Sequence, residues 1–153
     1  MYITIDNEQS LALHLVDNSS SRALVEALKQ GAITYEAHDY GNCEKVGPLG
    51  RTFPTNDEPV TTEPGDVILY RGSNLCLYYD TNTWDFTRIG RIEGHTQASL
   101  KRAFKAGQGN ISVTLSLTAA AAKAAAAAAL DVSRDSAVDL GDVNTILEHI
   151  LSE

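Results

Sequence analysis

The residues best suited to chemistry in this sequence lie between positions 40 and 88. Tyrosine and tryptophan side chains recur there among a few carboxylate, amide and cationic groups, a mixture typical of ligand pockets. We therefore expect a site for a small molecule or a peptide, with no catalytic residue. The predicted ligand-binding residues are Tyr40, Glu44, Lys45, Tyr70, Asn74, Tyr78, Trp84 and Arg88. The alternative is that the aromatic residues form an ordinary core and that Glu44 and Lys45 are a solvated charged pair.

A second chemical pattern lies in the acidic C-terminal segment, where oxygen-bearing side chains recur at the spacing of a calcium loop. Ser136 stands where the sharp turn of such a loop favours glycine. No cofactor is required by the sequence as a whole, and the spacing predicts calcium in the C-terminal loop alone. The alternative is an aspartate-capped amphipathic helix that needs no metal. The predicted metal ligands are Asp131, Ser133, Asp135, Asp139 and Asp142.

Short strands and turns must position the first set of residues. Leucines alternate with other residues over 11–15, which predicts a half-buried strand with residues 2–6 as its antiparallel partner. Further strands are predicted over residues 67–70, 75–79, 84–89 and 111–117, with helices over 20–31 and 96–107. Glycine, proline and charge over residues 40–62 predict a long binding loop or a structural loop packed by Phe53. Strands joined in this way are typical of a closed all-β barrel or a sandwich.

The chain divides into a predicted barrel domain of residues 1–118 and an appendage of residues 119–153. Ten of the eleven residues from Ala119 to Ala129 are alanine, which predicts a helix or linker. Such a run is also typical of an engineered linker or of residues whose side chains were never identified. The acidic loop and a second amphipathic helix follow this run. The apolar face of that helix is formed by Val143, Ile146, Leu147, Ile150 and Leu151.

The charge balance and the apolar content exclude several classes of protein. The chain has 12 basic and 20 acidic residues and a formal net charge of −8, which disfavours nucleic acid as a partner. No stretch approaches the ~18–20 apolar residues that span a bilayer, so no membrane partner is expected. The N-terminus lacks the basic flank and apolar run of a signal peptide, which predicts a cytoplasmic location. The sequence contains no nucleophile elbow, no phosphate-binding loop and no histidine-rich metal motif, so no motif suggests an enzyme.

Four blocks resemble, in order, the bacterial cyclophilin-like family of small barrel domains. They are DYGNCEKVGPL at residues 39–49, EPGDVILY at 63–70, NLCLYY at 74–79 and WDFTRIGRI at 84–92. The resemblance implies a mainly β fold, a closed eight-stranded barrel with two helices. The biochemical role of that family is mostly unestablished, so a binding module is the first expectation and a peptidyl-prolyl isomerase the alternative. The motifs that hold the arginine of true cyclophilins are not found in this chain.

The acidic loop and the helix after it resemble one repeat of a dockerin, the calcium-dependent module that binds a cohesin. Aspartate at the last loop position and a helix on the C-terminal side alone carry the resemblance. It implies a cohesin-like partner at the C-terminal helix, a component of an extracellular assembly, and an extracellular location.

Overall fold

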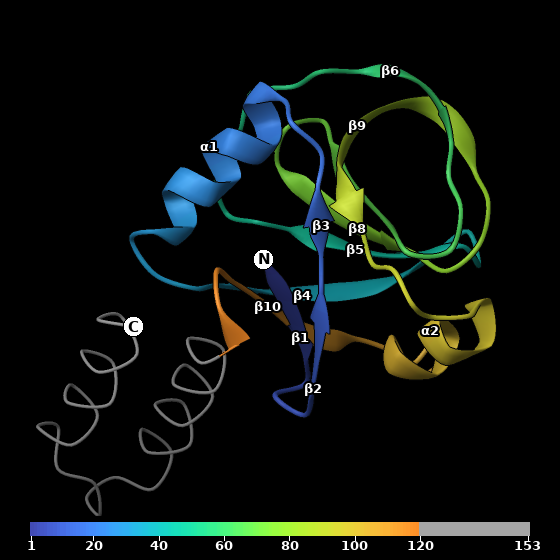
Figure 1. The fold of residues 1–153 in the computed structure, drawn as a ribbon. Coiled ribbons are helices and arrows are strands. Elements are labelled where there is room, and N and C mark those ends of the chain that lie inside the picture. The colour runs from blue at the N-terminus through green and yellow to red at the C-terminus, as the bar shows by residue number, and fades with distance from the viewer. Residues whose placement is uncertain (120–153) are drawn as a thin grey trace, which may run out of the picture.

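The computed structural model describes residues 1–119, and the predicted calcium loop and C-terminal helix lie outside these described residues (Figure 1). Short strands make up most of the described chain, and two helices interrupt them. The strands are β1 (Tyr2–Ile5), β2 (Gln9–Ala12), β3 (His14–Leu15), β4 (Ile33–Tyr40), β5 (Glu44–Pro48), β6 (Glu58–Thr61), β7 (Asp66–Tyr70), β8 (Asn74–Tyr78), β9 (Thr83–Arg91) and β10 (Ile111–Ser116). The helices are α1 (Ser19–Leu28) and α2 (Gln97–Ala103).

The strands form a nearly closed antiparallel barrel. Their order is β2-β1-β10-β4-β5-β8-β7-β9-β3, and β6 lies off this path and pairs with β9. Strands β2 and β3 are consecutive in the chain, so one segment pairs with β1 at Ala12 and with β9 at His14. This segment joins the two edges of the sheet, and counting it as one strand gives eight strands around the ring. The predicted mainly β, eight-stranded barrel with two helices is confirmed.

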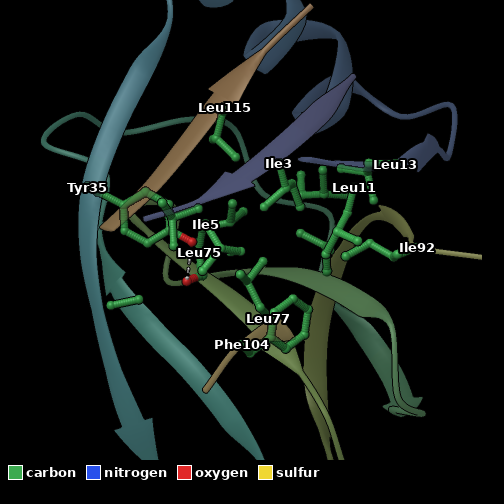
Figure 2. Packing of buried hydrophobic residues seen from close by; sticks show 14 of the residues in the cluster. Ile3, Ile5, Leu11, Leu13, Tyr35, Leu75, Leu77, Ile92, Phe104 and Leu115 are labelled. Carbon is green, nitrogen blue, oxygen red and sulfur yellow. Dashed lines mark hydrogen bonds between the residues drawn. The ribbon is translucent and has the colours of Figure 1, made fainter. Parts of the chain in front are cut away.

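The barrel interior is filled by aliphatic and aromatic side chains from opposite walls (Figure 2). Ile3 from β1 and Leu77 from β8 point inward, and each is fully buried. Leu24 of α1 and Leu100 of α2 join the same cluster, so both helices pack onto this core. Burial of one such side chain contributes roughly 1.5–3 kcal/mol to stability, and the helices are held mainly by this packing.

Strands β7 and β8 carry apolar side chains on both faces. Val67 and Leu69 point into the barrel, whereas Ile68 between them packs on the outer face. A second buried cluster is thereby formed outside the barrel, under β6 and β9. Its members are Cys43, Val60, Ile68, Cys76, Tyr78 and Phe86.

The prediction of one long loop over residues 40–62 is wrong, because β5 and β6 lie within it. Gly47 is required by packing: a Cβ atom there would lie 1.9 Å from the carbonyl oxygen of Glu36 on β4. Pro59 is tolerated because β6 pairs with β9 alone among the described strands, and an edge strand accepts proline. The sequence patterns predict no strand over residues 33–40, where the structure has β4. In this strand the inward side chains of Tyr35 and Ala37 alternate with outward neighbours. Within residues 1–119 no helix is long and apolar enough to cross a membrane.

Candidate ligand-binding cleft

A cleft of about 560 Å³ lies on the outer face of the barrel, over strands β4, β5, β8, β7 and β9. The outer apolar cluster provides part of its floor, since Tyr78 and Phe86 belong to both. The ring centroid of Phe86 lies 5.8 Å from that of Tyr78 and 6.4 Å from that of Tyr70, so the three rings hold one another in place. The cleft is lined by His38, Tyr40, Glu44, Val46, Tyr70, Arg71, Asn74, Tyr78, Asn82, Trp84 and Phe86.

Two aromatic side chains of the lining are exposed. Tyr40 on β4 is 66% exposed and Trp84 on β9 is 63% exposed. Three strands separate β4 from β9 in the sheet, so these rings come from opposite sides of the cleft. They can therefore contact a bound molecule from two directions.

Glu44 is the one buried carboxylate of the described lining, with 6% of its surface exposed. It stands opposite Tyr78 in the β5–β8 pairing and opposite Tyr40 in the β4–β5 pairing. The Tyr78 hydroxyl and the Cys76 thiol both donate hydrogen bonds to its carboxylate. Burial raises the pKa of the Glu44 carboxyl, and these two bonds and nearby His38 oppose that rise without cancelling it.

Arg71 lies at the other end of the cleft, in the turn between β7 and β8. Its guanidinium carbon lies 5.1 Å from the centre of the Tyr70 ring, a cation–π contact that orients the exposed side chain. The Asn74 amide donates to the Tyr70 carbonyl across the same turn at 3.5 Å. Arg71 itself has a φ of 53°, so its backbone in this turn lies in the left-handed region.

Lys45 is not brought into the cleft, although it follows Glu44 directly. Successive side chains of a strand point to opposite faces, and the Lys45 side chain is 0% exposed on the far side of the sheet. Its ammonium donates to the carboxylate of Asp39 at 2.8 Å and also to the carbonyl of Gly109. The interpretation of Glu44 and Lys45 as a solvated pair is therefore wrong.

Asp39 receives two further hydrogen bonds in this arrangement. The Tyr79 hydroxyl donates to it at 2.8 Å and the Gly107 amide at 3.0 Å. Burial alone would raise the pKa of Asp39, but the Lys45 ammonium and these two donors lower it overall. The hydrogen bonds of Asp39 and Lys45 connect β4 and β5 to the segment between α2 and β10, so the role of this pair is structural.

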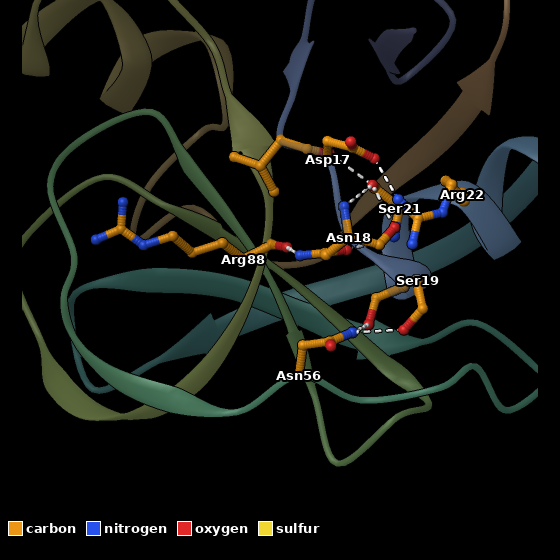
Figure 3. A network of polar contacts seen from close by, with 9 residues as sticks. Asp17, Asn18, Ser19, Ser21, Arg22, Asn56 and Arg88 are labelled. Atoms are coloured by element: carbon orange, nitrogen blue, oxygen red, sulfur yellow. Dashed lines mark hydrogen bonds and ion pairs between the residues drawn. The ribbon is translucent and has the colours of Figure 1, made fainter.

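Arg88 also lies outside the cleft lining. Its side chain is 43% exposed, and its Nε atom lies 3.9 Å from a carboxylate oxygen of Glu58. Figure 3 shows that its backbone carbonyl accepts a hydrogen bond from the Asn18 side chain, at 2.8 Å. Asn18 also caps α1 by accepting from the Ser21 amide at 2.8 Å, so β9 is connected to the start of that helix.

The structure thus brings six of the eight predicted residues around one cleft and places Lys45 and Arg88 elsewhere. A role in ligand binding stays a prediction for all eight residues. Sequence reasoning missed His38 and Arg71, although His38 precedes Tyr40 by two residues and thus shares its face of the strand. No group of three or more histidine, cysteine, aspartate or glutamate residues within 1–119 is arranged to hold a metal.

These features define a small antiparallel barrel that carries a cleft on its outer face. The model of the cyclophilin-like family matches residues 3–116, and the chain belongs to that family. The matched residues lie within the predicted barrel domain of residues 1–118. Neither a curated protein nor a solved structure gives a significant match to the chain.

Proposed function

We propose that the outer cleft binds a small molecule or a short peptide, and that the barrel acts as a binding module. The observation that carries this proposal is the pair of exposed rings, Tyr40 and Trp84, beside a buried carboxylate. Four large hydrophobic side chains are exposed among the described residues, and the two aromatic ones flank this cleft, whereas Leu15 and Val16 line a separate hollow beside α1. Exposed apolar groups gathered at a concave surface are typical of interaction sites.

Glu44 supports the same proposal. A carboxylate that is buried beside a phenol and a thiol lowers stability relative to an apolar or amide side chain. Residues held at such a cost are typical of functional sites. Structural ion pairs also perturb carboxylates, but no lysine, arginine or histidine within residues 1–119 forms an ion pair with Glu44.

Trp84 makes the proposal directly testable, because it is the single tryptophan of the whole chain. A library of small molecules and short peptides is screened by tryptophan fluorescence, and positive compounds are measured by calorimetry. Substitution Tyr40→Ser should weaken the binding of each positive compound. Leu15→Ser, at an exposed apolar residue outside the cleft, should leave that binding unchanged. Equal weakening by both substitutions, or no positive compound at all, would contradict a binding role for this cleft.

A second candidate function, peptidyl-prolyl isomerisation, is favoured by one observation: Arg71 stands beside the aromatic floor of the cleft. The assay follows cis-to-trans conversion of a chromogenic Ala-Ala-Pro-Phe anilide. The binding proposal expects no rate above the uncatalysed one. Catalysis that Arg71→Ala abolishes, and that Arg51→Ala at an exposed residue outside the cleft leaves intact, would replace it with isomerase activity.

For residues 119–153, the sequence pattern supports a separate proposal of calcium binding and of docking to a cohesin-like protein through the C-terminal helix. The carrying observation is the spacing of Asp131, Ser133, Asp135, Asp139 and Asp142. An extracellular location is part of this proposal.

A further inference from the structure

We infer that the ligand of the cleft is a short extended peptide with free termini, its ammonium group at Glu44 and its carboxylate at Arg71. This inference rests on the proposed binding function and names the class of ligand. It follows from three properties of the cleft: an unpaired acid at one end, an unpaired base at the other, and an aromatic floor between them.

The acid is Glu44. The Tyr78 hydroxyl and the Cys76 thiol donate hydrogen bonds to its carboxylate, and both donors are neutral. His38 lies nearby in the same lining but forms no ion pair with Glu44. Lys45, the nearest lysine in the sequence, is committed to Asp39 on the other face of the sheet. A ligand ammonium would therefore supply the ion-pair partner that this carboxylate lacks within the described chain.

The base is Arg71. No carboxylate among residues 1–119 forms an ion pair with its guanidinium, which is instead held against the face of Tyr70 at 5.1 Å. A guanidinium presents parallel N–H groups that match the two oxygens of a carboxylate. Its ring contact leaves those groups free, so Arg71 is suited to receive the carboxylate end of a ligand.

The separation of the two ends sets the length of the ligand. Glu44 pairs with Tyr78, and Asn74, which pairs with Tyr70, lies four residues back along β8. At about 3.3 Å per residue, the two ends of the cleft lie ~13 Å apart. An extended chain of about four residues has that length. Opposite charges at the two ends also select against ligands that are only anionic or only cationic.

The floor between the two ends accepts apolar side chains. Val46, Tyr78 and Phe86 lie there, and Tyr40 and Trp84 rise at the sides. A peptide with small or aliphatic central residues fits this surface, and its binding would cover Trp84. Because the chain has one tryptophan, a change in tryptophan fluorescence reports a change in the surroundings of Trp84.

The test compares four forms of the tetrapeptide Ala-Leu-Leu-Ala: free at both ends, acetylated, amidated, and blocked at both ends. Affinities are measured by Trp84 fluorescence and by calorimetry on the full chain. With the unmodified protein, acetylation and amidation should each weaken binding by about tenfold or more. In Glu44→Gln the cost of acetylation should disappear, and in Arg71→Gln the cost of amidation should disappear. Arg51→Gln is the matched control and should retain both costs.

The outcomes separate this inference from the binding function itself. Equal affinity for free and blocked peptides with the unmodified protein overturns the inference and needs no variant that must fold. Penalties that persist in Glu44→Gln and Arg71→Gln also overturn it. If no form of the peptide binds while another compound changes Trp84 fluorescence, the inference fails and the binding function stands. If no compound of any class changes it, both fail.

Discussion

The buried ion pair between Lys45 and Asp39 gives a prediction whose size follows from the structure. Substitution Lys45→Met keeps the aliphatic stem of a fully buried side chain but removes its ammonium. Asp39 then keeps the Tyr79 hydroxyl and the Gly107 amide as donors, and the Gly109 carbonyl loses its partner. Breaking one side of a buried pair costs about 3–5 kcal/mol. Because the Asp39 side chain is 23% exposed, we expect the lower end, about 3 kcal/mol.

The assay is urea unfolding followed by circular dichroism, with Lys101→Met on the exposed side of α2 as the control. The control should change the free energy of unfolding by less than about 0.5 kcal/mol. The double variant with Asp39→Asn should lose less than the sum of the single losses, since both changes remove one interaction.

The pH dependence supplies an independent check. The pKa of Asp39 is lower in the folded than in the unfolded chain, so its contribution to stability is present above the unfolded pKa. That contribution is lost as the pH falls through the folded pKa. Lys45→Met removes a main cause of the shift, so the variant should show a weaker loss of stability in acid. A destabilisation below about 1 kcal/mol, or an unchanged acid profile, would refute this reasoning.

Three further predictions concern the cleft, the sheet and the acidic loop. Burial raises the pKa of Glu44, so the carboxylate lowers stability as the pH rises through its folded pKa; Glu44→Gln should raise the unfolding midpoint at neutral pH and lose that gain in acid, as thermal melts at several pH values will show. Gly47→Ala should destabilise the barrel by more than about 3 kcal/mol in urea unfolding, because its Cβ would meet the Glu36 carbonyl at 1.9 Å; a stable variant would contradict the close pairing of β4 and β5. Calorimetry with calcium should give binding heat that Asp131→Ala abolishes, and the absence of heat from the unmodified chain would remove the metal site.

Much of the barrel could be predicted because its strands carry local patterns. Alternating residues over 111–117 and the turns before Val67 and Leu75 indicate strands without reference to the rest of the chain. The segment of residues 40–62 misled the interpretation because Gly47 and Pro59 look like loop residues. Their places in β5 and β6 depend on neighbours that a local pattern does not contain.

The candidate site was predicted by residue type, and that method cannot assign faces without a strand boundary. Glu44 and Lys45 were grouped because they are adjacent, yet adjacency in a strand separates side chains. Once residues 44–48 are known to form β5, alternation places the Lys45 side chain on the face of the sheet opposite to that of Glu44. Arg71 carried no signal, since its contact with Tyr70 depends on a turn whose backbone the sequence does not specify.

Local patterns are sufficient to predict the class of fold, the family and the residue types available for binding. Alternation, turn residues and four ordered motifs are local properties, and they can be recognised without knowing which strands pair with which. The closure of the barrel by residues 9–15, and the positions of Glu44 and Arg71 at opposite ends of one cleft, follow only from the folded arrangement of the strands. Strand pairing brings together residues far apart in the chain, such as Tyr2 with Ser116 and Glu44 with Tyr78, and no local pattern records which strands become neighbours.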